Sequence, residues 1–169
     1  MEENIETKLD FKSKLLNLYN KNKLKILILF LILFASIFLI TYIKYDNDKK
    51  NKLISEKYIQ AGLYLSSEEK GKAKKLYKEI ILSKNAFYSV LALNTIIEKN
   101  LEKNENEVLS YFTIVQDLDF PEEKLDLINF KKALYLYKLS RNEEGKLLLE
   151  NLIKKNSKLK LLAEEILSN

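Results

Sequence analysis

The chain has 169 residues, a formal net charge of +5, and neither cysteine nor histidine. These absences exclude disulfides, thiolate or imidazole metal ligands, and the commonest general base and thiol nucleophile. The three glycines are too far apart for a phosphate-binding loop. Neighbouring acids such as Glu122 and Glu123 fit helix starts better than catalytic dyads. We therefore expect no enzyme, no metal site and no cofactor.

The charge balance also argues against nucleic-acid binding. From Lys44 onward there are 23 Lys and Arg against 20 Asp and Glu, and Arg141 is the only arginine. Base readout and bidentate phosphate contacts favour arginine. We expect no nucleic-acid partner.

Residues 1–23 form a basic tail, and residues 24–43 are predicted to be a transmembrane helix. Residues 26–43 carry no charge, lysines bound both ends, and Tyr42 and Tyr45 lie where an interfacial aromatic belt is expected. The apolar stretch is longer than that of a cleaved signal peptide and no cleavage site follows it. We expect an uncleaved anchor in the lipid bilayer rather than a buried core helix.

The orientation of the anchor is not decided by charge. Five lysines lie within 15 residues of each end of the apolar stretch. The positive-inside rule therefore gives no direction. A short tail followed by a long C-terminal part is typical of a signal anchor with a cytoplasmic N-terminus.

Residues 44–169 are predicted to form one all-α domain. A single proline and few glycines favour helices, and apolar spacing places them near 47–65, 68–83, 86–100, 105–118, 122–139, 143–155 and 158–168. Capping boxes are expected at Ser66–Glu69 and Asp119–Glu122, and caps at Asn142 and Ser157.

The helices show a repeated pattern of small and large residues. A small residue on the first helix of a pair is followed twelve residues later by one on the second, at 61 and 73 and again at 133 and 145. The second-helix positions recur after 35 and 37 residues, close to a tetratricopeptide period of about 34. We expect a tetratricopeptide-like α-solenoid of about three pairs plus a capping helix. The predicted packing positions are Ala61, Tyr64, Ala73, Tyr77, Ile80, Val108, Phe112, Val115, Ala133, Leu136, Gly145, Leu149 and Leu152.

The order of these parts resembles a known family. A lysine-rich segment ending in LLNLYNKNKLK precedes the span, and a helix pair containing YIQAGLYLSSEEKGKAKKLYKEI follows it. FPEEKLDLINFKKALYLYKL and a closing helix with Ala163, Glu164 and Leu167 complete the chain. The chain resembles the ancillary SecYEG translocon subunits with a tetratricopeptide-like domain, of the alphaproteobacterial type. It departs from them in the low alanine content of its middle pair.

The resemblance implies a location and partners. Such proteins are non-catalytic, single-pass proteins of the bacterial inner membrane, with a cytoplasmic N-terminus and a periplasmic repeat domain. The implied partners are the SecYEG translocon, a membrane-anchored periplasmic chaperone and exported client proteins.

Two alternatives remain open from the residues. One is a membrane-anchored scaffold with a cytoplasmic repeat domain that assembles an envelope complex. The other is a lipid-surface protein in which the basic pre-anchor segment lies on anionic lipid.

A solenoid presents a concave face lined by the first helices of its pairs. Residues in a simple core would show the same pattern. The candidate partner-binding residues on that face are Tyr58, Leu65, Leu127, Phe130, Leu134 and Tyr137.

Overall fold

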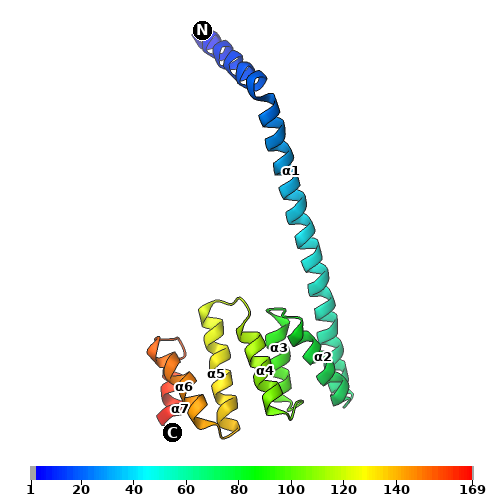
Figure 1. Ribbon diagram of the computed structural model, residues 1–169, viewed down its shortest axis with the longest axis vertical. Coiled ribbons are helices and arrows are strands. Elements are labelled where there is room, and N and C mark those ends of the chain that lie inside the picture. Colours follow the sequence, from blue (N-terminus) through cyan, green and yellow to red (C-terminus); the bar gives the residue numbers. More distant parts are fainter. Residues whose placement is uncertain (1–2, 169) are drawn as a thin grey trace. The chain divides into compact units, whose positions relative to one another are not determined.

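The computed structural model describes residues 3–168, with side chains described at positions 13, 14 and 16 and from 19 to 168. Within this range every regular element is an α-helix, seven helices occur, and there is no strand (Figure 1). The predicted all-α class is confirmed. The chain divides into two compact units, residues 1–50 and residues 51–169.

The first helix, α1 (Glu3–Ser66), is longer than the sequence pattern predicts. The pattern placed a separate helix near 47–65, whereas the structure has a single helix through that region. No proline or glycine interrupts the chain before Gly62, and an ion pair of 2.6 Å between Lys50 Nζ and Asp46 Oδ2 joins successive turns.

One stretch of α1 is long and apolar enough to cross a membrane. None of its apolar window is buried inside the structure, unlike the window of a core helix. The large apolar side chains between Leu24 and Ile43 are exposed, except that of Ile26, which is half-buried. This helix is compatible with a single membrane span.

Six shorter helices follow α1, close to their predicted positions. They are α2 (Lys70–Leu82), α3 (Tyr88–Glu98), α4 (Glu105–Gln116), α5 (Glu122–Lys138), α6 (Asn142–Lys154) and α7 (Lys160–Ser168). Each boundary lies within two residues of the prediction. In Figure 1, α3, α4 and α5 run alongside one another, and each packs on the next.

The predicted caps are correct at one position only. Ser157 Oγ accepts a hydrogen bond from the N–H of Leu159 at the start of the last helix. The N-terminal residues flanking α2, α5 and α6 make no side-chain capping bond, so the boxes at Ser66 and Asp119 and the cap at Asn142 are wrong. Ser66 instead lies in the last turn of α1, where its hydroxyl donates to the carbonyl of Gly62.

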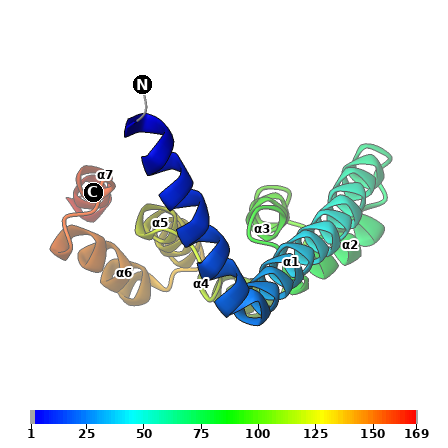
Figure 2. The ribbon, with the colours of Figure 1, turned by 90° about the horizontal axis from the view of Figure 1, so that it is seen from above.

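Two clusters of buried apolar side chains hold residues 51–169 together. The larger is built from α1 through α5, and the smaller joins α5, α6 and α7. Figure 2 shows α6 beside both α5 and α7, and both pairs of helices are in contact. Helix α5 therefore contributes to both clusters.

The larger cluster begins with aromatic contacts between α1, α2 and α3. The ring of Tyr58 lies 5.5 Å from that of Tyr77, edge to face, and 5.7 Å from that of Tyr88. An ion pair of 2.7 Å between Lys57 Nζ and Glu79 Oε2 lies nearby on the same two helices, α1 and α2. The part of α1 after residue 50 is thus packed into the second unit.

Candidate partner-binding groove

An open groove lies between α3 and α5 on the second unit. It consists of two adjoining hollows that share Asn94 and Lys131. The larger has a volume of about 250 Å³ and the smaller about 40 Å³. We call the two together the α3–α5 groove. The larger hollow is lined by Asn94, Ile97, Glu98, Lys131, Leu134, Tyr135 and Lys138, and the smaller by Val90, Leu93, Asn94, Phe112, Val115, Lys124, Leu127, Ile128 and Lys131.

Local sequence fixes where the two helices that border the groove begin. Asn85 Oδ1 accepts hydrogen bonds from the N–H groups of Phe87 at 3.1 Å and Tyr88 at 3.0 Å, which satisfies donors at the start of α3. Helix α5 begins directly after Pro121, with Glu122 and Glu123 in its first turn. A proline disfavours the helical conformation of the residue before it, so the helix does not begin earlier. Acidic side chains are stabilised at the positive end of the helix dipole.

The spacing along α5 places its groove residues on one face. Leu127, Lys131, Leu134 and Lys138 follow at intervals of four, three and four, and Lys124 lies three residues before the first of them. Residues three and four apart are neighbours on a helix surface. The face therefore alternates between a cationic and an aliphatic side chain at each turn.

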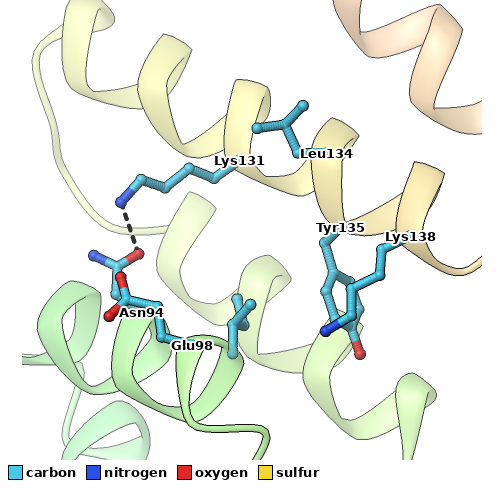
Figure 3. A pocket seen from close by; sticks show the side chains of 7 residues that line it. Asn94, Glu98, Lys131, Leu134, Tyr135 and Lys138 are labelled. Atoms are coloured by element: carbon cyan, nitrogen blue, oxygen red, sulfur yellow. Dashed lines mark hydrogen bonds between the residues drawn. The ribbon is translucent and has the colours of Figure 1, made fainter.

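A hydrogen bond crosses the groove at its middle. Lys131 Nζ donates to Asn94 Oδ1 at 2.9 Å, joining α5 to α3 where the two hollows meet. Figure 3 shows this bond, with Leu134, Tyr135 and Lys138 further along α5 and Glu98 on α3. The bond is between a cation and a neutral amide, so the charge of Lys131 is not neutralised.

The base of the groove is apolar. Phe112 and Val115 of α4 are almost fully buried beneath the smaller hollow. The ring of Tyr135 lies 5.9 Å from that of Phe112, and burial raises the pKa of its phenol above the ordinary value. The groove thus offers apolar contact area between charged rims.

The structure divides the six predicted partner-binding residues into three groups. Tyr58 and Leu65 pack against the larger cluster, and Phe130 and Tyr137 against the smaller. Leu127 and Leu134 are 44% and 41% exposed and line the groove, so they are the two that the structure brings together.

The thirteen predicted packing positions lie in the interior of the second unit. Tyr64 is half-buried, and the other twelve are buried. Gly145 shows why a small residue is needed: a Cβ atom there would lie 2.9 Å from ring atoms of Tyr137 and 3.1 Å from the carbonyl oxygen of Ala133.

Sequence reasoning missed the residues of α3 and the lysines of the groove. Asn94 and Lys131 are 37 residues apart and meet only through packing. The seven-residue spacing of Lys124, Lys131 and Lys138 was a signal that was present in the sequence. Seven residues are close to two helical turns, so this spacing places the lysines on one helix face.

The lining of the groove contains three lysines beside its apolar side chains. Glu98 is its one carboxylate, and in the part of the chain that the structure describes no group of three or more acids could hold a metal ion.

The chain matches no protein-family model, and no curated protein or solved structure matches it significantly.

Proposed function

We propose that this chain is a non-catalytic, membrane-anchored adaptor that binds partner proteins through its helical domain. The observation that carries the proposal is an open, partly apolar groove on a helical unit whose chain continues into an apolar, membrane-length helix. Exposed apolar side chains that gather in a hollow favour protein binding.

The helical domain is proposed to be a tetratricopeptide-like solenoid. Its pairs are residues 51–66 with α2, α3 with α4, and α5 with α6, and α7 is the cap. Ala61 and Ala73 of the first pair share one cluster, and Gly145 of the third pair closely approaches Ala133. In this arrangement α3 and α5 are the first helices of neighbouring pairs, which are the helices expected to line a concave face.

The proposed partner assembly is the Sec translocon of a bacterial inner membrane. The support is the resemblance in the order of tail, anchor and helical pairs to ancillary translocon subunits. In this proposal the tail is cytoplasmic, the helical domain is periplasmic, and the adaptor helps exported proteins reach a membrane-anchored chaperone.

The first experiment determines the orientation of the anchor. The chain has no cysteine, so Ser67→Cys and Ser13→Cys each introduce a single thiol at an exposed position on either side of the apolar stretch. A maleimide that enters the periplasm but does not cross the inner membrane is expected to label position 67 and not position 13 in intact cells. The reverse pattern would overturn the proposal and favour the cytoplasmic scaffold.

The second experiment identifies the partner. A photo-crosslinking amino acid replaces Leu134 in the groove or, as a control, Leu161, which is 77% exposed outside it. We expect crosslinks to a translocon subunit, its chaperone or an exported protein from position 134 and few from position 161. Equal crosslinking from both positions, or none to these classes of protein, contradicts the proposed role.

A further inference from the structure

The three lysines of the α3–α5 groove have no acidic partner among the residues that the structure describes. Lys131 donates to the amide of Asn94, and Lys124 lies 4.1 Å from the ring centroid of Phe120 and 3.5 Å from the carbonyl oxygen of Ala86. Among the described residues, Lys124, Lys131 and Lys138 form no ion pair. Their charges are therefore available to an external anion.

Several lysines at the other helix contacts form ion pairs within the fold, whereas Lys132 donates to the amide oxygen of Gln116 at 2.9 Å. Among the described residues, the ion pairs that join different segments of the second unit are Lys57–Glu79, Lys74–Glu102, Lys78–Glu107, Lys155–Glu122, Lys155–Asp126 and Lys158–Glu123. The groove lysines differ, because only Glu98 opposes them among the lining residues. The groove carries an excess of positive charge.

Aliphatic surface separates these charges at each turn. Leu127 lies between Lys124 and Lys131, and Leu134 lies between Lys131 and Lys138. Both leucines are more than a third exposed, although each lines a hollow with an apolar base. A complementary ligand needs carboxylates and aliphatic side chains in alternation.

The dimensions favour a slender ligand. From residue 124 to residue 138, α5 rises about 21 Å at 1.5 Å per residue. An extended chain covers that length with about six or seven residues at 3.3 Å each. Hollows of about 250 and 40 Å³ receive side chains, whereas a whole helix is about 10–12 Å wide.

We propose that the α3–α5 groove binds an extended acidic segment of a partner protein, in which aliphatic residues alternate with Asp or Glu. The inference rests on the proposed function as an adaptor and specifies the class of its ligand. A carboxylate replaces the amide of Asn94 as the partner of Lys131, so that both partners of the hydrogen bond are ionised. Aliphatic side chains fill the hollows beside Leu127 and Leu134.

The test uses the full-length chain in nanodiscs of phosphatidylcholine, which has no net charge. The probe is a fluorescein-labelled peptide of seven residues in which glutamate and leucine alternate, and its binding is measured by fluorescence anisotropy. Two matched peptides carry glutamine in place of glutamate or serine in place of leucine. We expect each to bind at least tenfold more weakly than the probe.

Charge variants separate the groove from the overall charge. Lys124→Gln, Lys131→Gln and Lys138→Gln together are expected to weaken binding at least tenfold. The control changes three exposed lysines that make no ion pair among the described residues, Lys70→Gln, Lys75→Gln and Lys103→Gln, and is expected to change affinity less than twofold. Glu98→Gln removes the opposing charge and is expected to strengthen binding two- to threefold.

Apolar variants test the hollows. Leu127→Ser with Leu134→Ser is expected to weaken binding at least fivefold, and the control, Leu147→Ser with Leu161→Ser, exposed outside the groove, less than twofold. Because all four leucines are exposed, these variants are expected to keep the unfolding temperature of the parent.

Several results would overturn the inference. They are equal effects of the groove and control variants, equal binding of the glutamine or serine peptide, and no binding of the probe. Displacement of the probe by phosphatidylglycerol vesicles, together with direct vesicle binding that the groove variant loses, would assign the groove to anionic lipid instead. Crosslinking to the translocon that survives the groove substitutions would leave the adaptor standing while this inference fails. Probe binding by a chain that captures no translocon component would support this inference while the proposed translocon role fails.

Discussion

Gly145 lies where α5 and α6 come into close contact, and the space there excludes a methyl group. A Cβ atom would meet the ring of Tyr137 at 2.9 Å and the backbone of Ala133 at 3.1 Å. No glycine in the described chain has a positive φ, so the requirement is steric and not conformational. The repeat pattern has a small residue at this position because a larger side chain would not fit between the two helices.

We predict that Gly145→Ala destabilises the domain. Overpacking costs about 1–3 kcal/mol, which exceeds the roughly 1 kcal/mol by which alanine is favoured over glycine in a helix. The expected net loss is about 1 kcal/mol in the free energy of unfolding, measured by urea denaturation of the full chain in detergent with tyrosine fluorescence.

Gly62→Ala is the matched control for this substitution. No atom lies within 4 Å of a Cβ at that position of α1. The same helix preference is therefore expected to stabilise the domain by up to about 1 kcal/mol. Similar gains in both variants would show that α5 and α6 do not approach as closely as described.

At the scale of the elements, two ion pairs join α2 to α4 and to the loop that precedes it. Lys74 Nζ lies 3.1 Å from Glu102 Oε2, and Lys78 pairs with Glu107. The N–H of Asn104, and then Lys74, lower the pKa of Glu102. Lys78, and then the hydroxyl of Tyr111, lower the pKa of Glu107.

These lowered pKa values predict a loss of stability in acid. A carboxyl whose pKa is lower in the folded than in the unfolded state stabilises the fold above its ordinary value of 4.5. That contribution disappears as the pH falls through the lowered pKa. Glu102→Gln with Glu107→Gln is expected to lower the free energy of unfolding by about 1 kcal/mol at pH 7, a modest loss because the lysines are nearly half exposed. The free energy of unfolding of this variant is also expected to fall less steeply as the pH is lowered.

Urea denaturation at a series of pH values measures this effect. The control is Glu56→Gln with Glu143→Gln, two exposed acids that make no ion pair in the described part of the chain. If the free energy of unfolding falls as steeply in acid in the Glu102 and Glu107 variant as in the control, these ion pairs are not the source of the acid sensitivity.

The extents of the helices follow largely from local sequence, and their contacts do not. Apolar spacing placed α2 to α7 within two residues, because each helix buries one stripe. Caps were harder, because several side chains compete for each start: Asn104 caps α4 by accepting from the N–H groups of Asn106 and Glu107, where no cap was predicted.

The groove could be predicted only in part. Leu127 and Leu134 were found because the repeat pattern places them on a first helix. Asn94 was not found, because its contact with Lys131 depends on the packing of α3 beside α5, which no local pattern contains. Tyr58 was predicted to bind a partner but packs in the core. Its hydroxyl lies 3.4 Å from that of Thr95, and its ring packs on two other tyrosines.

At the scale of the whole molecule, the two units differ in what stabilises them. All large apolar side chains from Leu24 to Ile43 except Ile26 are exposed, which is compatible with a membrane span, and none of them belongs to a buried cluster. All residues of both hydrophobic clusters lie at or after Ile54, within the second unit. The fold of the helical domain therefore needs nothing that precedes residue 51.

We predict that residues 51–169 fold alone in water. The fragment is expected to be helical by circular dichroism and to unfold cooperatively within about 5 °C of the domain transition of the full chain in detergent. A second fragment, residues 68–169, lacks Tyr58 and Ala61 of the larger cluster. Removing a core aromatic side chain alone costs about 3–5 kcal/mol, so this fragment is expected to unfold at a much lower temperature. Aggregation of the longer fragment, or equal stability of the two, would mean that the end of α1 is not part of the domain core.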